Sequence, residues 1–210
     1  MSRSTMDPIA VAATVQQALV GGPSEEEILG GWVHPIDTDM DFVRSGIYRW
    51  YHAIGEALRP SSILEIGVRF GYSLRSLTLG SKEVQTIRGY DMELDHVGSS
   101  AYVLQRFKDE FPEVDIAIAN VDTRNVRSLA CTGLFDLAHV DGDHSEEGCY
   151  HDCILACRYV RSGGYLLIDD VASGGGDPRA RRGALRFLEE RQIEAVILDT
   201  YRGLYIAQIP

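Results

Sequence analysis

Acidic and imidazole side chains follow two apolar runs of the sequence, at the points where the runs stop. They are Asp141, Asp143 and His144 after F-D-L-A-H-V (135–140), and Asp169 and Asp170 after G-Y-L-L-I (164–168). If both runs are neighbouring strands, Asp141, Asp169 and Asp170 converge and their charges repel. A hard divalent cation with oxygen ligands, such as Mg²⁺, relieves that repulsion, so these three carboxylates form a candidate metal site.

The elements that must position these side chains alternate from residue 61 onward. Strand-like runs lie at 62–66, 84–90, 114–119, 135–140, 164–168, 194–198 and 204–209. Helical stretches are expected between them, at about 72–79, 97–111, 145–161 and 178–191. This alternation predicts an α/β fold with a doubly wound, mostly parallel seven-stranded sheet and a terminal antiparallel pair. Ligands of such sheets bind outside the carboxyl ends of the strands.

Residues 1–60 read as an N-terminal helical extension that covers the substrate side, and residues 61–210 as the main domain. A capping box begins at Ser24 with Glu27, and an amphipathic helix is expected over 41–58. The pocket candidates from this extension are His34, Tyr48 and Tyr51.

The turn after the first strand reads L-E-I-G-V-R-F-G-Y-S. Gly67 and Gly71 allow a tight turn and close approach of a ligand to a helix N-terminus, but the spacing is not that of the dinucleotide motif G-x-G-x-x-G. Asp91, which ends the second strand, is placed to accept hydrogen bonds from both hydroxyls of a ribose. Asp122 is placed either to meet a base edge or to serve a simple turn.

At these residues the chain resembles the class I S-adenosylmethionine-dependent methyltransferases. E-I-G-V-R-F-G-Y-S looks like the family's first motif and G-Y-D-M like its acidic second motif. Two longer segments, H-V-D-G-D-H-S-E-E-G and G-G-Y-L-L-I-D-D, resemble marks of a subgroup of small-molecule O-methyltransferases that includes enzymes acting on sugars of natural products. The resemblance covers about residues 61–208, and Arg69 is a modest departure from it.

The resemblance implies a cofactor, S-adenosylmethionine, and a role for each matching residue. The Gly67–Gly71 turn would pack against its methionine part, Asp91 would hold the ribose, and Asp122 would lie near the adenine. Glu65 would bond around the amino-acid part or brace the turn. The remaining expected cofactor contacts are Arg69, Ser73, Met92 and Asp141.

The resemblance also implies the reaction, which is methyl transfer to a hydroxyl group of a sugar or another natural-product intermediate. Metal-dependent members of the family bind Mg²⁺ at the ends of the strands that correspond to 135–140 and 164–168. The matching residues in this sequence are Asp141, Asp169 and Asp170. His144 is the first candidate for the base that takes the hydroxyl proton, and Asp143 is its rival or a helix cap. Two alternatives stay open: a metal-dependent hydroxylase-like or hydrolytic enzyme, and a nucleoside-binding protein without catalysis.

The composition of the chain indicates which classes of partner it is expected to bind. A net charge of −11 over 210 residues argues against nucleic acid. No apolar run is long enough to span a bilayer and the N-terminus has no signal-like segment, so we expect a cytoplasmic protein that does not bind membranes. Enzymes of this type often dimerise through added helices, so a homodimer is expected by analogy.

Three further groups of residues have plain structural interpretations. Cys149, Cys153 and Cys157 share one face of a helix, which favours packing over metal binding. His139 is expected to be a hydrogen-bonded core residue. The glycines at 174–176 suggest a mobile lid, whereas the nearby arginines, Arg179, Arg181 and Arg182, either bind an anion or cover a helix surface.

Overall fold

The computed structural model describes residues 6–33, 45–92 and 99–210. Its centre is a seven-stranded sheet in the order β3-β2-β1-β4-β5-β7-β6. The strands are β1 (Ser62–Ile66), β2 (Thr86–Asp91), β3 (Asp115–Asn120), β4 (Phe135–Val140), β5 (Val160–Ile168), β6 (Ala195–Leu198) and β7 (Leu204–Gln208). The first five run parallel, and β7 is antiparallel to both β5 and β6. The predicted fold class is confirmed, including the antiparallel pair at the end of the chain.

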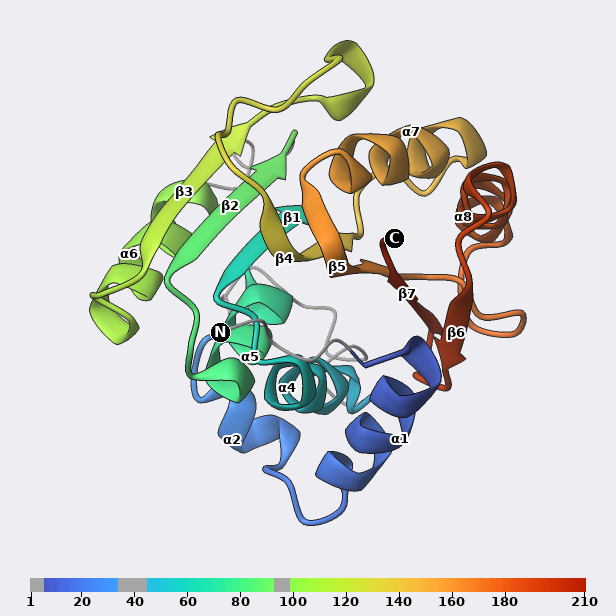
Figure 1. Ribbon diagram of the computed structural model, residues 1–210. Coiled ribbons are helices and arrows are strands. Elements are labelled where there is room, and N and C mark those ends of the chain that lie inside the picture. Colours follow the sequence, from blue (N-terminus) through green and yellow to red (C-terminus); the bar gives the residue numbers. More distant parts are fainter. Residues whose placement is uncertain (1–5, 34–44, 93–98) are drawn as a thin grey trace.

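Helices cover both faces of the sheet (Figure 1). They are α1 (Pro8–Leu19), α2 (Glu25–Leu29), α4 (Ile47–Leu58), α5 (Tyr72–Ser81), α6 (Ser99–Glu110), α7 (Glu146–Cys157) and α8 (Pro178–Arg191), with a 3₁₀ turn η1 (Thr123–Asn125). One apolar cluster joins α1, α4, α5 and α6 to the sheet, and a second cluster joins α7 and α8 to the opposite face. None of these helices is long and apolar enough to cross a membrane.

The central strands are buried on both faces, as parallel strands between two helical layers must be. In β1, Ile63 packs into the first cluster, whereas Leu64 and Ile66 pack into the second. Glu65 lies between Leu64 and Ile66 in the sequence and shares the face of Ile63. Its side chain, a carboxylate, is fully buried. The strand therefore places a charged group in the core directly below its carboxyl end.

The N-terminal helices share this core with the sheet. Ile54 of α4 lies in the same cluster as Ile63 of β1 and Leu74 of α5. Two glycines make the crossing of α4 and α5 close: a Cβ at Gly55 would lie 2.3 Å from the Leu77 carbonyl oxygen, and one at Gly80 would lie 2.0 Å from that of His52. This close packing holds α4 beside the first strand and the turn that follows it.

Sequence reasoning misplaced the boundary between α7 and β5. The helix expected over 145–161 begins correctly, with Ser145 as N-cap, but α7 ends at Cys157 and β5 begins at Val160. Arg161 therefore lies in the strand, where its Nε donates to Asp136 Oδ1 at 2.6 Å. Gly163 lies within β5 with a φ of 75°, in the stretch where the β4–β5 register shifts. The β-branched Val160 pairs with Phe135 of β4, and this pairing outweighs the helical pattern.

Candidate functional site

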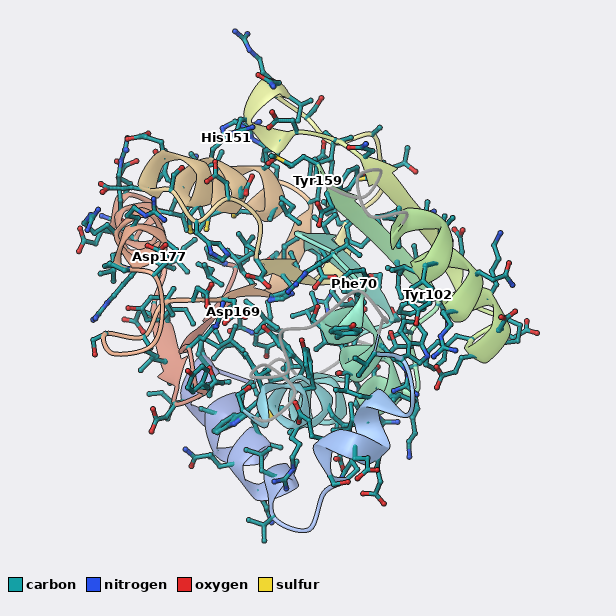
Figure 2. All side chains as sticks on the ribbon, turned by 180° about the vertical axis from the view of Figure 1, so that it is seen from behind. Phe70, Tyr102, His151, Tyr159, Asp169 and Asp177 are labelled. Carbon is teal, nitrogen blue, oxygen red and sulfur yellow. The ribbon has the colours of Figure 1, made fainter. Side chains whose placement is uncertain are left out.

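A single cavity of about 640 Å³ lies at the carboxyl ends of the strands and collects most of the predicted site residues. Those that line it are Tyr48, Tyr51, Gly67, Arg69, Ser73, Asp91, Met92, Asp122, Asp141, Asp143, His144 and Asp169. Figure 2 labels two residues of this lining, Phe70 from the turn after β1 and Asp169 directly after β5. The residues expected to bind the nucleoside and the acidic residues of the candidate metal site thus line the same cavity.

Three predicted residues lie behind this lining. Glu65 is completely buried, and Asp170 is 2% exposed. Gly71 packs against α6, where a Cβ would lie 2.9 Å from Val103. His34 lies outside the described residues.

The glycine turn has the geometry expected for close approach to a ligand. Gly67 has a φ of 93°, and a Cβ there would lie 1.9 Å from the Asp141 carbonyl oxygen, so glycine is required. Gly71 is the N-cap of α5 and provides no side-chain cap. Asp91 braces the turn, because its Oδ2 accepts a hydrogen bond from the Arg69 backbone N–H at 2.7 Å. The turn and the end of β2 are therefore one unit.

Asp122 takes the turn role that the sequence left open. As N-cap of η1 it accepts from the Arg124 backbone N–H at 3.1 Å and from the Arg124 Nε at 2.9 Å. The hydrogen bond from the Arg124 side chain lowers the pKa of Asp122. Arg124 also lines the cavity and contacts Met92 Sδ at 3.6 Å, a contribution that sequence reasoning missed.

The acidic candidates do converge. His144 lies between two of them, with Nε2 3.3 Å from Asp141 Oδ1 and Nδ1 3.2 Å from Asp170 Oδ2. Arg202, from the turn between β6 and β7, places Nη1 3.2 and 3.1 Å from the two oxygens of Asp170. Nothing in the sequence pointed to Arg202, because its partner lies 32 residues away.

The charges at this corner perturb one another. Burial, followed by repulsion from Asp141 and Asp170, raises the pKa of Asp169 to about 7. Burial and Asp141 also raise the pKa of Asp170. The hydrogen bond to Asp141 and the nearby charges of Asp141 and Asp170 outweigh burial at His144, and raise its pKa to about 9. The three carboxylates therefore repel one another, and His144 and Arg202 offset part of their charge.

This donor set fits a divalent cation. Ligand atoms of Asp141, His144 and Asp170 lie within 4.8 Å of one another, as do those of His139, Asp141 and Asp169, although both His139 nitrogens already have hydrogen-bond partners. Carboxylate oxygens suit Mg²⁺, and an imidazole nitrogen in the set also suits Mn²⁺. Burial and mutual repulsion raise the pKa values of Asp169 and Asp170, and a cation bound between them would lower both.

His139 is a satisfied core histidine, as expected. It is fully buried, its Nδ1 lies 2.5 Å from Glu65 Oε1, and its Nε2 lies 3.0 Å from the Tyr51 hydroxyl oxygen. Burial alone would lower its pKa, but the hydrogen bond to Glu65 and the surrounding carboxylates raise it to about 9.

The plain interpretations of the cysteines and arginines also agree with the structure. Cys149 and Cys153 are buried on α7 and Cys157 is partly buried, all as free thiols. Arg179 pairs with Asp177 at the start of α8, and Arg182 pairs with Glu146. These two arginines cover helix surfaces.

Comparison with known proteins connects this geometry to a family. Residues 64–171 match the family described as "Methyltransferase domain". No curated protein sequence matches the chain.

Solved structures share the fold at low sequence identity. The SAH-bound methyltransferase PaMTH1 from Podospora anserina is 16% identical, with a TM-score of 0.68 and full coverage of both chains. The SAH complex of the O-methyltransferase from Bacillus cereus is 18% identical, with a TM-score of 0.58 over 96% of this chain and 91% of that one. TomG from Streptomyces achromogenes, in complex with SAM, is 15% identical, with a TM-score of 0.59 over 97% and 99%.

The family match spans the glycine turn, Asp91, the D-G-D-H segment and Asp169, all of which contribute to the cavity lining. The chain therefore belongs to the methyltransferase-domain family, as a class I S-adenosylmethionine-dependent methyltransferase.

Proposed function

We propose that this methyltransferase acts on a hydroxyl group of a small molecule, a sugar or another natural-product intermediate, with the assistance of a divalent cation. The observation that carries the proposal is the shared cavity. Its lining includes the glycine turn and Asp91 on one side and Asp141 and Asp169 on the other. A methyl donor and an oxygen nucleophile held at these two places would meet inside one cavity.

The donor half is supplied by the first three strand ends. The glycine turn lets the methionine part of S-adenosylmethionine approach the backbone, and Asp91 accepts hydrogen bonds from the ribose hydroxyls. Met92 and Arg124 line the cavity beside Asp122, where the adenine would lie. The SAH-bound and SAM-bound structures with the same fold support S-adenosylmethionine as the donor.

The acceptor half is supplied by β4, β5 and α4. Asp141, Asp169 and Asp170 would hold the divalent cation. When bound, such an ion lowers the pKa of a coordinated hydroxyl group. Ile47, Tyr48, Phe70 and Tyr72 provide an apolar and aromatic wall against which the body of the acceptor can pack.

His144 is the proposed base, and its contacts define when it can act. While it bridges Asp141 and Asp170, its pKa of about 9 keeps it protonated at neutral pH. It becomes a proton acceptor when those contacts are given up, because the two carboxylates are what retain the proton. Asp143 is the rival, although its Oδ1 already accepts the Ser145 backbone N–H at 2.8 Å.

Binding and transfer can be tested separately. We expect SAH to bind the purified protein in calorimetry even with excess EDTA. Asp91→Ala should weaken this binding at least about tenfold, through the loss of charge-assisted hydrogen bonds. Asp141→Ala should leave SAH affinity within about twofold, since the expected loss lies in turnover. The absence of any SAH signal with the unmodified protein would end the proposal.

The cation needs its own experiment. Transfer of a labelled methyl group from S-adenosylmethionine to a panel of catechols and glycosides should disappear in EDTA and return with Mg²⁺. Full transfer in excess EDTA would remove the cation from the mechanism while leaving methyl transfer intact.

A further inference from the structure

A continuous chain of hydrogen bonds runs through the core beneath the cavity. Ser73 Oγ donates to Glu65 Oε1 at 2.6 Å, and the same oxygen lies 2.5 Å from His139 Nδ1. His139 Nε2 lies 3.0 Å from the Tyr51 hydroxyl oxygen, and that hydroxyl donates to Asp169 Oδ2 at 2.6 Å. All five residues are less than 10% exposed.

The chemistry of the tyrosine fixes the direction of the chain. A phenol has one proton to donate, and Tyr51 gives it to the Asp169 carboxylate. The Tyr51 oxygen must therefore accept at its other contact, so His139 carries a proton on Nε2. Each group in this part of the chain is oriented toward Asp169.

The Asp169 carboxylate is held at both of its oxygens. Oδ1 accepts from the Asp170 backbone N–H at 2.8 Å, and Oδ2 accepts from Tyr51. Rotation about the last bond of an aspartate is otherwise broad, so these two contacts decide the plane that the carboxylate presents to the cavity. Tyr51 belongs to α4 and lies outside the matched residues 64–171.

We propose that Tyr51, held by His139, is a positioning residue that fixes the Asp169 carboxylate for binding a divalent cation. The inference rests on the cation of the proposed function. It identifies how this chain orients one of the residues that would bind the cation, Asp169. Residues that orient a metal ligand from behind typically change metal affinity 10–100-fold when they are replaced.

The test compares metal affinity with cofactor affinity in the full-length protein. Tyr51→Phe keeps the ring and removes only the hydroxyl. We expect this variant to bind Mn²⁺ about tenfold more weakly, as measured by electron paramagnetic resonance. Its SAH affinity, measured by calorimetry, should stay within about twofold of that of the unmodified protein. The matched control is Tyr165→Phe, which removes a phenol hydroxyl bonded to the Met6 carbonyl oxygen outside the cavity. The control should change neither affinity.

Two replacements of His139 separate positioning from general loss of core contacts. The amide nitrogen of glutamine can occupy the place of Nε2, so His139→Gln keeps a donor for Tyr51. The amide nitrogen of asparagine can occupy the place of Nδ1, so His139→Asn keeps a donor for Glu65 and loses the donor for the Tyr51 hydroxyl. We expect His139→Gln to bind Mn²⁺ within about threefold of the unmodified protein, and His139→Asn to lose as much affinity as Tyr51→Phe.

Each outcome decides the inference. Equal Mn²⁺ affinity in Tyr51→Phe and the unmodified protein overturns it and leaves the proposed function untouched. Equal losses in both His139 variants also overturn it. If the unmodified protein binds SAH but not Mn²⁺, the inference falls together with the cation of the proposed function, and binding of the methyl donor stands. If it binds neither, the proposed function fails as well.

Discussion

The two consecutive aspartates after β5 show how a single residue shapes the site. Successive side chains of a strand point to opposite faces, so Asp169 and Asp170 would normally diverge. Asp170 instead has a φ of 60°, the left-handed region that aspartate tolerates better than most residues. Its carbonyl oxygen accepts from the Asp177 N–H at 2.9 Å, and its carboxylate contacts His144 and Arg202. This local turn lets both carboxylates share a corner with Asp141.

Replacement of the two base candidates should identify the base. His144→Gln keeps a hydrogen-bonding side chain but cannot take a proton at neutral pH, so we expect kcat to fall about 10²–10⁴-fold with SAH affinity unchanged. Asp143→Asn keeps an oxygen that can accept the Ser145 N–H, so we expect less than about a tenfold loss. Steady-state methyl transfer measures both variants. The reverse ranking would assign the proton to Asp143.

Packing of α4 against α5 is the element-level feature on which the site depends. Gly55→Ala would ordinarily favour a helix, but its Cβ would lie 2.3 Å from the Leu77 carbonyl oxygen. We expect the helices to separate and the free energy of unfolding to fall by about 1–3 kcal/mol in urea denaturation. Gly174→Ala, where nothing lies within 4 Å of the new Cβ, should change it by less than about 0.5 kcal/mol. A Gly55→Ala protein as stable as the unmodified one would contradict this account.

The beginning of α4 is capped by another helix. Its N-cap, Gly46, has no side chain, and Glu25 of α2 accepts the backbone N–H groups of Tyr48 at 2.9 Å and Arg49 at 3.1 Å. Burial raises the pKa of Glu25 from 4.5 to about 7, against the opposing effect of these hydrogen bonds and of the Arg49 charge. The folded protein thus binds this proton more tightly than the unfolded chain.

This shift predicts a pH dependence with a definite sign. The contribution of protonated Glu25 to stability is complete below about pH 4.5 and is lost as the pH rises through about 7. Urea denaturation at pH 5 and pH 8 should therefore show a larger loss of unfolding free energy in the unmodified protein than in Glu25→Gln, whose amide does not titrate. Equal losses in the two proteins would show that Glu25 titrates normally.

At the scale of the whole molecule, the sequence predicted the sheet well because its signals are local. Apolar runs and helix caps defined the strands β1 and β4 and the helix α8 to the residue. The misplaced end of α7 has a different cause, since the pairing of Val160 with Phe135 depends on a strand that the local pattern does not contain. Patterns along the chain therefore predict elements better than their boundaries.

The site was predictable where motifs fix it and unpredictable where tertiary contacts fix it. The strand-end rule placed Asp91, Asp141 and Asp169 in one region. It gave no indication that Arg202 would bind Asp170, or that Tyr51 would reach Asp169 through the core. Both contacts join segments that only the completed sheet brings together.

The hydrogen bond between Tyr51 and Asp169 also bears on the order of folding. Its partners are 118 residues apart, whereas Arg69 and Asp91, which brace the donor half, are 22 residues apart. Closing a longer loop costs more chain entropy, and contacts between distant residues tend to form late. The donor-binding half of the cavity is thus expected to mature before the acceptor half, so a partly folded chain would recognise the nucleoside before it could arrange Asp169.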